Sequence, residues 1–193
     1  LASVPQLLTE PSRFSRNPGS DMFRPVVMTS YAVNYALGEL DPRGYHALNL
    51  LVHLATSLVV FEALRRLRMS QPESLAAALL FAVHPLATQP INYVSSRSES
   101  LAALGAWLAV LLYLGHGGWQ RAGSLVSYVF ALGAKSVALW VAPALALHAV
   151  LTAERQAWKR QWPYWAVAAG YVALVRAQVA EAFVEAPVRE LPV

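Results

Sequence analysis

The chain has 193 residues, of which 56% are hydrophobic and 13% are charged, and its formal net charge is +4. An ordinary soluble domain carries about 25% charged residues, and the apolar residues here are gathered into runs, so the composition favours a membrane protein. The basic residues stand at the ends of these runs and not along one face, which argues against nucleic-acid binding. The sequence has no cysteine, which excludes disulfides and a thiolate nucleophile.

The first part of the chain is mixed in composition. Residues 1–23 predict a surface loop with one short turn at Gln6–Thr9. Pro25 suits the first turn of a helix that runs to about Leu37, where Gly38 can form the C-terminal cap. This helix is too short to cross a membrane, so we expect it to lie in the interface. A core helix of a soluble domain is the alternative for this segment.

The first residues of the sequence lack the features of a natural N-terminus. It begins at Leu1 and not at Met, and no charged segment followed by an apolar core opens it, so no signal peptide is recognised. We expect the sequence to be a fragment of a longer reading frame. A single membrane domain is expected over 1–193, with an external loop and the interfacial helix in 1–43 and membrane helices in 44–193.

Apolar runs of membrane-spanning character fill the rest of the chain. Tyr45–Leu64 matches the roughly 20 apolar residues that a bilayer requires, and Arg65, Arg66 and Arg68 end it. The further runs are 74–83, continuing past Pro85 as a bent helix, 96–114, 119–133 and 136–152 hinged at Ala134–Lys135, and 164–175, with polar loops at 69–73, 115–118 and 154–163. The sequence thus predicts an all-α fold, a polytopic membrane helix bundle of about six membrane helices.

Positive charge near the ends of these runs predicts an orientation. We assign the face that receives the basic loops to the cytoplasm; these loops are 65–73, 115–123 and 154–163. The other face receives residues 1–43, the turn 84–99 and Lys135. The unusual polar residues then share the non-cytoplasmic face.

The turn 84–99 ends in Ser96-Arg97-Ser98-Glu99, which has the spacing of a capping box, with Ser96 as N-cap and Glu99 reaching back. A helix N-terminus also favours anions, because its free N–H groups and its dipole attract negative charge. Arg97 adds a planar fork suited to phosphate. Capping and phosphate binding are compatible, so both interpretations stay open.

Other polar residues interrupt the apolar runs. Lys135 either extends to the interface, as lysines at span ends do, or supplies a second cation for the same anion. His46, Asn49 and His53 share one face of the first span, but the histidines are about 10.5 Å apart along the helix, too far for one zinc ion. This seam suits interhelical hydrogen bonds or the lining of a cavity. His84 is either a histidine satisfied at a helix break or a substrate contact.

Several short motifs follow one another along the chain. They are Phe23-Arg24-Pro25-Val26, Ser30-Tyr31-Ala32-Val33-Asn34-Tyr35, the segment Gly44 to His53, His84-Pro85, Thr88-Gln89 and Arg97-Ser98-Glu99-Ser100-Leu101-Ala102-Ala103-Leu104. In this order they resemble the membrane domain of the transmembrane-and-tetratricopeptide-repeat proteins and their bacterial relatives. These belong to the GT-C class of polytopic glycosyltransferases, alongside protein O-mannosyltransferases. The resemblance covers about residues 23–152 and implies a partial GT-C-like fold.

The resemblance implies transfer of a mannose-like sugar from a polyprenyl-phosphate donor to a protein or other acceptor on the non-cytoplasmic face. The expected partners are the lipid bilayer, the lipid-linked sugar and a protein acceptor, with no nucleic acid. The bacterial cytoplasmic membrane is expected in preference to the endoplasmic reticulum membrane. The expected donor-phosphate contacts are Arg97 and Lys135, whose charge would match a departing phosphate. The expected substrate-cavity residues are Arg24, His46, Asn49, His84, Gln89 and Glu99.

In such enzymes an acidic pair near the start of the first external loop supplies the catalytic base, and we expect this chain to begin after that point. Glu10 and Asp21 are not in the expected context, so no catalytic residue is assigned. Gln89 stands where many relatives have Glu, and Ser136 follows Lys135 where an acid is usual. No metal ligand is assigned, although the resemblance leaves room for a divalent metal. The repeats expected downstream are not in this sequence.

Two other classes stay open. A non-catalytic membrane module that binds a lipid or positions a partner would need no acidic pair. A small-solute transporter would show pseudo-symmetric repeats, and the sequence shows none.

Overall fold

The computed structural model describes residues 24–115, 117–153 and 157–185, and these residues form helices joined by short turns. The helices are α2 (Pro25–Gly38), α3 (Pro42–Arg66), α4 (Gln71–Val83), η2 (Pro85–Ala87), α5 (Thr88–Asn92), η3 (Val94–Ser96), α6 (Arg97–Tyr113), α7 (Gly118–Ala134), η4 (Ser136–Trp140), α8 (Val141–Leu151) and α9 (Ala157–Glu185). The prediction of an all-α fold is confirmed for this part of the chain. The predicted loop 1–23, with Gln6–Thr9, Glu10 and Asp21, lies outside the described residues.

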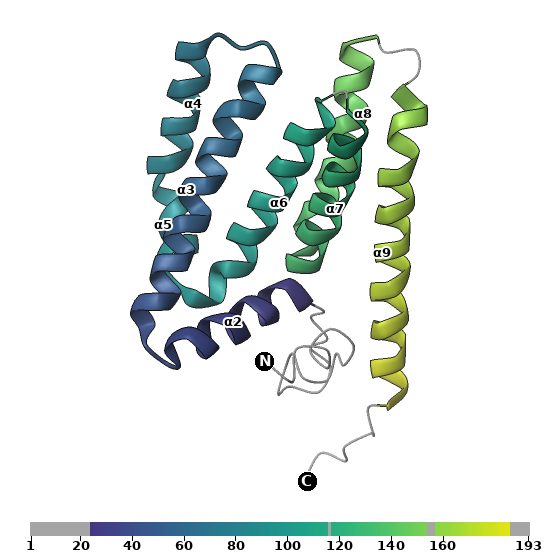
Figure 1. Cartoon of the computed structure of the whole chain (residues 1–193). Helices are drawn as coiled ribbons and strands as arrows, with labels where there is room; N and C mark the ends of the chain where they lie inside the picture. The colour runs from purple at the N-terminus through teal and green to yellow at the C-terminus, as the bar shows by residue number, and fades with distance from the viewer. Residues whose placement is uncertain (1–23, 116, 154–156, 186–193) are drawn as a thin grey trace.

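The longer helices stand side by side, and α2 lies across one end of them (Figure 1). Helix α6 packs against α3 and against α7. The core where α6 and α7 meet contains Ala106, Ala109 and Ala131, together with the buried ring of Tyr128. Small residues let helix backbones approach closely, as they do in membrane helix bundles.

Gly105 lies where α6 passes close to α7. A Cβ atom added at Gly105 would lie 2.8 Å from Cδ1 of Phe130 and 3.0 Å from the carbonyl oxygen of Ser127. A side chain at this position would therefore push the two helices apart.

Most predicted helix boundaries are confirmed to within a few residues. The bend past Pro85 is confirmed, because α4 and the segment Pro85–Asn92 meet at 50°. The hinge at Ala134–Lys135 is also confirmed, since Lys135 has an extended backbone between α7 and η4.

Two predictions about helix ends are wrong. Gly38 is the last residue of α2, and Glu39 takes the cap position with a φ of 50°. The loop predicted at 69–73 is helical from Gln71, because the backbone N–H and the hydroxyl of Ser70 both donate to the carboxylate of Glu73 and complete a capping box. These hydrogen bonds hold the pKa of Glu73 below its usual value.

The polar loop predicted at 154–163 is wrong for 157–163, because the chain is helical from Ala157. Residues 154–156 lie outside the described part of the chain. The polar side chains that suggested a loop bind neighbouring helices. Gln161 donates to the carbonyl oxygen of Leu145 at 3.0 Å, and Arg160 donates to that of Tyr113 at 2.7 Å. Tertiary hydrogen bonds thus support a helical turn whose composition is that of a surface loop.

Fewer helices have the length and composition of a membrane span than the six or so predicted. Among the described residues one helix, Pro42–Arg66, is long and apolar enough to cross a membrane, and a second counts if the bent pair of α4 and Pro85–Asn92 is one span. Helices α6 and α7 have 17 residues each, about 26 Å of helical rise against a hydrocarbon core of about 30 Å. The prediction of six membrane helices is therefore not confirmed.

The outer surfaces of α3 and α4 are nevertheless strongly apolar. Large exposed hydrophobic side chains on these two helices are Leu50, Leu51, Leu54, Leu58, Leu75, Leu79, Leu80 and Val83. Exposed apolar surface of this kind is typical of a membrane or a protein partner.

The close contact at Gly105 yields a prediction. Gly105→Ala should lower the free energy of unfolding by about 1–3 kcal/mol, because the added methyl group overpacks the α6–α7 contact. Gly170→Ala is the matched control: a Cβ atom there meets nothing within 4 Å, and alanine should stabilise α9 by up to about 1 kcal/mol. Thermal unfolding in detergent measures both variants. Equal shifts for the two variants would contradict the packing argument.

Candidate functional site

Two arginines from other helices donate hydrogen bonds to the C-terminal turn of α6, at the end of the bundle opposite α2. Arg66 donates to the carbonyl oxygen of Leu111 at 3.2 Å, and Arg160 donates to that of Tyr113 at 2.7 Å. Both oxygens belong to the last turn of α6, where carbonyls lack partners within the helix and attract positive charge. The residues predicted to bind substrate lie at the other end, which we call the α2 end.

Arg97 opens α6 at the α2 end, and its side chain is completely buried, with 0% exposed. Its Nε donates to Oδ1 of Asn49 at 2.8 Å, and its Nη1 donates to Oδ1 of Asn34 at 2.6 Å. Nη2 donates to the carbonyl oxygen of Tyr45 at 3.1 Å, and Nη1 also lies 3.4 Å from the hydroxyl of Ser30. The guanidinium group therefore binds α2 and α3 on several sides.

Two aromatic rings complete the surroundings of Arg97. Its Cζ lies 4.7 Å from the ring centre of Tyr31 and 5.4 Å from that of Tyr45, distances at which the ring faces attract a cation. None of the ion pairs among the described residues involves Arg97. Its charge is thus held by neutral oxygens and aromatic faces.

Tyr31 and Asn49 extend this network to the chain before α6. The hydroxyl of Tyr31 donates to the carbonyl oxygen of Val94 at 2.6 Å, and burial raises the pKa of this phenol against the opposing charge of Arg97. The amide of Asn49 donates to the carbonyl oxygens of Ile91 and Tyr93 at 3.4 and 3.5 Å. One buried cluster therefore fixes α2, α3 and the turn into α6.

The next two residues of α6 each contact a further cation. Ser98 accepts a hydrogen bond from Nη1 of Arg24 at 3.4 Å, and Glu99 pairs with Nζ of Lys135 at 2.7 Å. The first turn of α6 thus gathers three cations and one carboxylate. The predicted capping box is wrong, because Ser96 makes no side-chain cap bond and Glu99 faces Lys135 instead.

A cavity of about 520 Å³, which we call the His84 cavity, opens between α4, α5 and α6. His53, His84 and Glu99 are among its lining residues, and most of the others are apolar. Nδ1 of His84 accepts a hydrogen bond from the backbone N–H of Leu86 at 3.2 Å, and Nε2 of His53 lies 2.9 Å from the carbonyl oxygen of Ala82. Because a carbonyl oxygen can only accept, Nε2 of His53 is the donor in its contact, and Nδ1 of His84 is the acceptor in its own.

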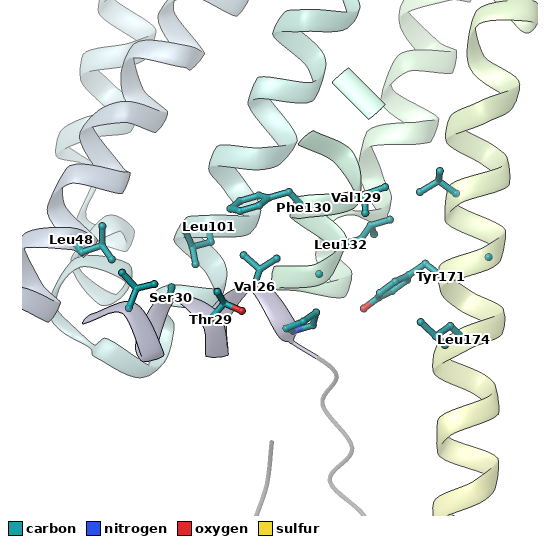
Figure 2. A pocket seen from close by; sticks show the side chains of 15 residues that line it. Val26, Thr29, Ser30, Leu48, Leu101, Val129, Phe130, Leu132, Tyr171 and Leu174 are labelled. Atoms are coloured by element: carbon teal, nitrogen blue, oxygen red, sulfur yellow. The ribbon is translucent and has the colours of Figure 1, made fainter. Parts of the chain in front are cut away.

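A larger cavity of about 750 Å³ lies between α2, α7 and α9, and we call it the α2–α9 cavity. Figure 2 shows Tyr171 and Leu174 of α9 facing Val26 and Thr29 of α2 across it. Most of the other lining residues are apolar. The cavity therefore suits an apolar chain better than a polar ligand.

Comparison with known proteins identifies relatives over about half of the chain. The chain is 40% identical over 91 residues to mouse "Protein O-mannosyl-transferase TMTC3", a match that covers 47% of this chain. It is 37% identical over 116 residues to human "Protein O-mannosyl-transferase TMTC4" and 35% identical over 104 residues to Drosophila melanogaster "Protein O-mannosyl-transferase Tmtc1", which covers 53% and 54% of this chain. The chain is a relative of the TMTC proteins.

The extent of the match to the TMTC proteins is limited. The chain spans 10%, 16% and 12% of the length of these three relatives. No protein-family model matches the chain, and no solved structure matches it significantly. The resemblance predicted from the sequence is confirmed. The relatives come from animals, so the comparisons lend no support to the expected bacterial location.

The structure gathers most of the residues predicted from the TMTC resemblance. Arg24, Asn49, Arg97, Glu99 and Lys135 meet around the start of α6, and the His84 cavity includes Glu99. The remaining two, His46 and Gln89, have exposed side chains and line neither cavity. The predicted seam of His46, Asn49 and His53 therefore holds for its two buried members alone.

Sequence analysis missed the partners of Arg97 on α2. Ser30 and Asn34 are four residues apart and so share one face of a helix, and both lie in a motif that carries the TMTC resemblance. A polar pair at this spacing on an otherwise apolar helix was the available signal. A metal site finds no support here, since the described residues contain no group of three potential ligands.

The buried network yields a second prediction. Arg97→Lys should lower the free energy of unfolding by about 2–4 kcal/mol, because one ammonium group cannot reach acceptors on both α2 and α3 and leaves some of them buried and unpaired. Lys135→Gln is the control, since its ion pair is partly exposed and such pairs contribute about 0–1 kcal/mol. Thermal unfolding in detergent compares them. A larger loss for Lys135→Gln would contradict this assignment.

Proposed function

We propose that this chain is part of the membrane domain of a glycosyltransferase that moves a mannose-like sugar from a polyprenyl-phosphate donor to a protein hydroxyl. The observation that carries the proposal is the similarity of half the chain to proteins named protein O-mannosyl-transferases. The cation cluster at the α2 end supports it, because a lipid-linked donor presents one phosphodiester beside an apolar chain.

The donor phosphate would bind Lys135 and Arg24. Arg24 directly precedes Pro25, which lines the α2–α9 cavity, and Lys135 follows Gly133, which lines it as well. Both cations are therefore close in sequence to residues that line an apolar cavity. A volume of about 750 Å³ lies within the range of about 300–1,000 Å³ that is usual for ligand sites.

Arg97 has a different role in this proposal from the one its sequence context suggested. Its side chain is buried and binds acceptors on α2 and α3, so a phosphate would have to displace them to reach it. Arg97 is therefore a positioning residue that holds α2 beside the start of α6. Lys135, with 29% of its side chain exposed, can exchange Glu99 for a phosphate.

The chain would lie in the membrane with the α2 end on the non-cytoplasmic side. The opposite end carries Arg65 and Arg66 in the last turn of α3, Arg68 just after it, and Lys159 and Arg160 in α9, and cytoplasmic ends are rich in such residues. The exposed apolar surfaces of α3 and α4 would face lipid. On this proposal the shorter helices also cross the bilayer, by tilting little or by local thinning.

Introduced cysteines test this orientation, because the chain has none of its own. Ser95→Cys at the α2 end should react with a membrane-impermeant thiol reagent applied outside intact cells, and Gly118→Cys at the opposite end should react only after permeabilisation. Both positions are exposed, so reactivity reports the side and not burial. Labelling of position 118 from outside would overturn the orientation.

Binding of a polyprenyl-phosphate analogue to the purified chain tests the phosphate site. Lys135→Gln should weaken binding about tenfold, since a hydrogen bond to a charged group contributes about 1.5–3 kcal/mol. Glu99→Gln should strengthen binding several-fold, because it removes the carboxylate that competes for Lys135. Arg43→Gln is the matched control, an exposed cation that has its side chain in neither cavity.

Because the two variants should change binding in opposite directions, the result distinguishes the site from an effect of overall charge. Weaker binding in Lys135→Gln together with tighter binding in Glu99→Gln supports the site. Equal weakening in Lys135→Gln and Arg43→Gln would mean that only overall charge matters, and the assignment would fail.

A non-catalytic lipid-binding module is the second candidate, favoured by the largely apolar lining of the α2–α9 cavity. Such a module would bind the analogue in the same way. An assay of mannose transfer to a protein acceptor, made with the protein that contains this chain, distinguishes the transferase from the lipid-binding module. Only the transferase would form product, and it would lose product formation when Lys135 is replaced.

A further inference from the structure

The opposite end of the bundle contains a small basic cavity that the proposed function does not use. Its volume is about 180 Å³, and it lies between the ends of α6, α7 and α9. Arg121, Lys159 and Arg160 line it together with Tyr113 and Tyr164, and its described lining includes no acidic residue.

The position of these cations is unfavourable for the helices that carry them. Arg121 lies in the first turn of α7, and Lys159 and Arg160 lie in the first turn of α9. Helix N-termini carry partial positive charge and favour anions, yet neither first turn contains an acidic residue. Two helix starts converge on this cavity together with Arg121 and Lys159, and a bound anion would relieve the repulsion between these two cations.

A buried hydroxyl points to the same conclusion. Tyr113 lines the cavity with only 3% of its surface exposed, and its hydroxyl has no hydrogen-bond partner in the part of the chain that the structure describes. A buried donor without an acceptor costs about 1–3 kcal/mol. A phosphate oxygen in the cavity would supply the acceptor.

We propose that this cavity binds the phosphate of an anionic phospholipid headgroup. Tryptophans flank it in sequence: Trp119 lies two residues before Arg121, and Trp158 and Trp162 lie near Lys159, all three with exposed side chains. Exposed tryptophans collect at the level of lipid headgroups, and basic pockets between membrane helices bind acidic headgroups. This site rests on the membrane location proposed above but does not depend on transferase activity.

The neighbouring arginines at the end of α3 provide a comparison. Arg65 and Arg66 pair with Glu62 at 3.8 and 3.3 Å. Arg121 and Lys159 form no ion pair with any described residue. Arg121 and Lys159 therefore have no counter-charge among the described residues, whereas the arginines on α3 are partly neutralised within the chain.

Titration of the purified chain with phosphatidylglycerol in mixed micelles tests the site, with phosphatidylcholine as the neutral reference. Phosphatidylglycerol should raise the melting temperature of the wild type. The double variant Arg121→Gln/Lys159→Gln should bind it about 25-fold more weakly, since each juxtamembrane cation contributes about a factor of five. Without the lipid this variant should melt no earlier than the wild type, because unfavourable charges have been removed.

The variant Arg65→Gln/Arg68→Gln removes the same charge at the same end of the bundle but outside the cavity. It should retain the full phosphatidylglycerol effect. If it loses the effect as the cavity variant does, attraction is a property of the whole face and the site does not exist.

Two tyrosine variants distinguish binding in the cavity from a general attraction of the lipid by surface charge. Tyr113→Phe removes the hydroxyl that lacks a partner and should weaken phosphatidylglycerol binding about tenfold without lowering the melting temperature in its absence. Tyr128→Phe removes another buried hydroxyl without a partner, one that does not line the cavity, and should leave binding unchanged. Unchanged binding in Tyr113→Phe would overturn the proposal.

The source of the phosphate is decided in the same assay. Inorganic phosphate and glycerol 3-phosphate should raise the melting temperature only slightly. Both are added at the concentration at which phosphatidylglycerol gives its maximal rise. The full shift with either soluble anion would overturn the assignment to a lipid headgroup.

Discussion

The arrangement at the α2 end depends on the burial of one positive charge. Removing an arginine from water is costly unless its N–H groups find acceptors, and Arg97 finds them on α2 and α3 while it starts α6. The three helices are therefore coupled, since displacement of any one would leave a buried donor or acceptor unpaired. This coupling keeps α2 across the end of the bundle, where it forms one wall of the α2–α9 cavity (Figure 2).

The ends of α6 use arginine in two different ways. At its start Arg97 is enclosed by neutral oxygens and aromatic rings. At its end Arg66 and Arg160 reach in from other helices to the carbonyls of Leu111 and Tyr113. Helix α6 is thus tied at both ends to its neighbours by charged hydrogen bonds, which are stronger than neutral ones. Lys135 and Lys159 are not enclosed in this way, since Lys135 is partly exposed and Lys159 is exposed.

The motif around Arg97 does not reveal that its side chain is buried. An arginine in the first turn of a helix is suited to a phosphate, and the resemblance to the TMTC family favoured that role. The chain before it, however, folds back so that Asn34 and Asn49 occupy the positions a phosphate would take. The available cations are then its neighbours in space, Arg24 and Lys135, which contact the two following residues of α6.

The sequence by itself determined the all-α class, the approximate helix boundaries, the bend near Pro85 and the resemblance to the TMTC proteins, because these follow from apolar runs, helix-breaking residues and short contiguous motifs. It also indicated that polar residues far apart in the chain share one end of the bundle. Only the tertiary structure decided which of them are buried, since partners such as Asn34 and Arg97 are 63 residues apart. The pairing of Glu99 with Lys135 and the helical state of 157–163 were likewise decided by contacts between helices, which no local pattern records.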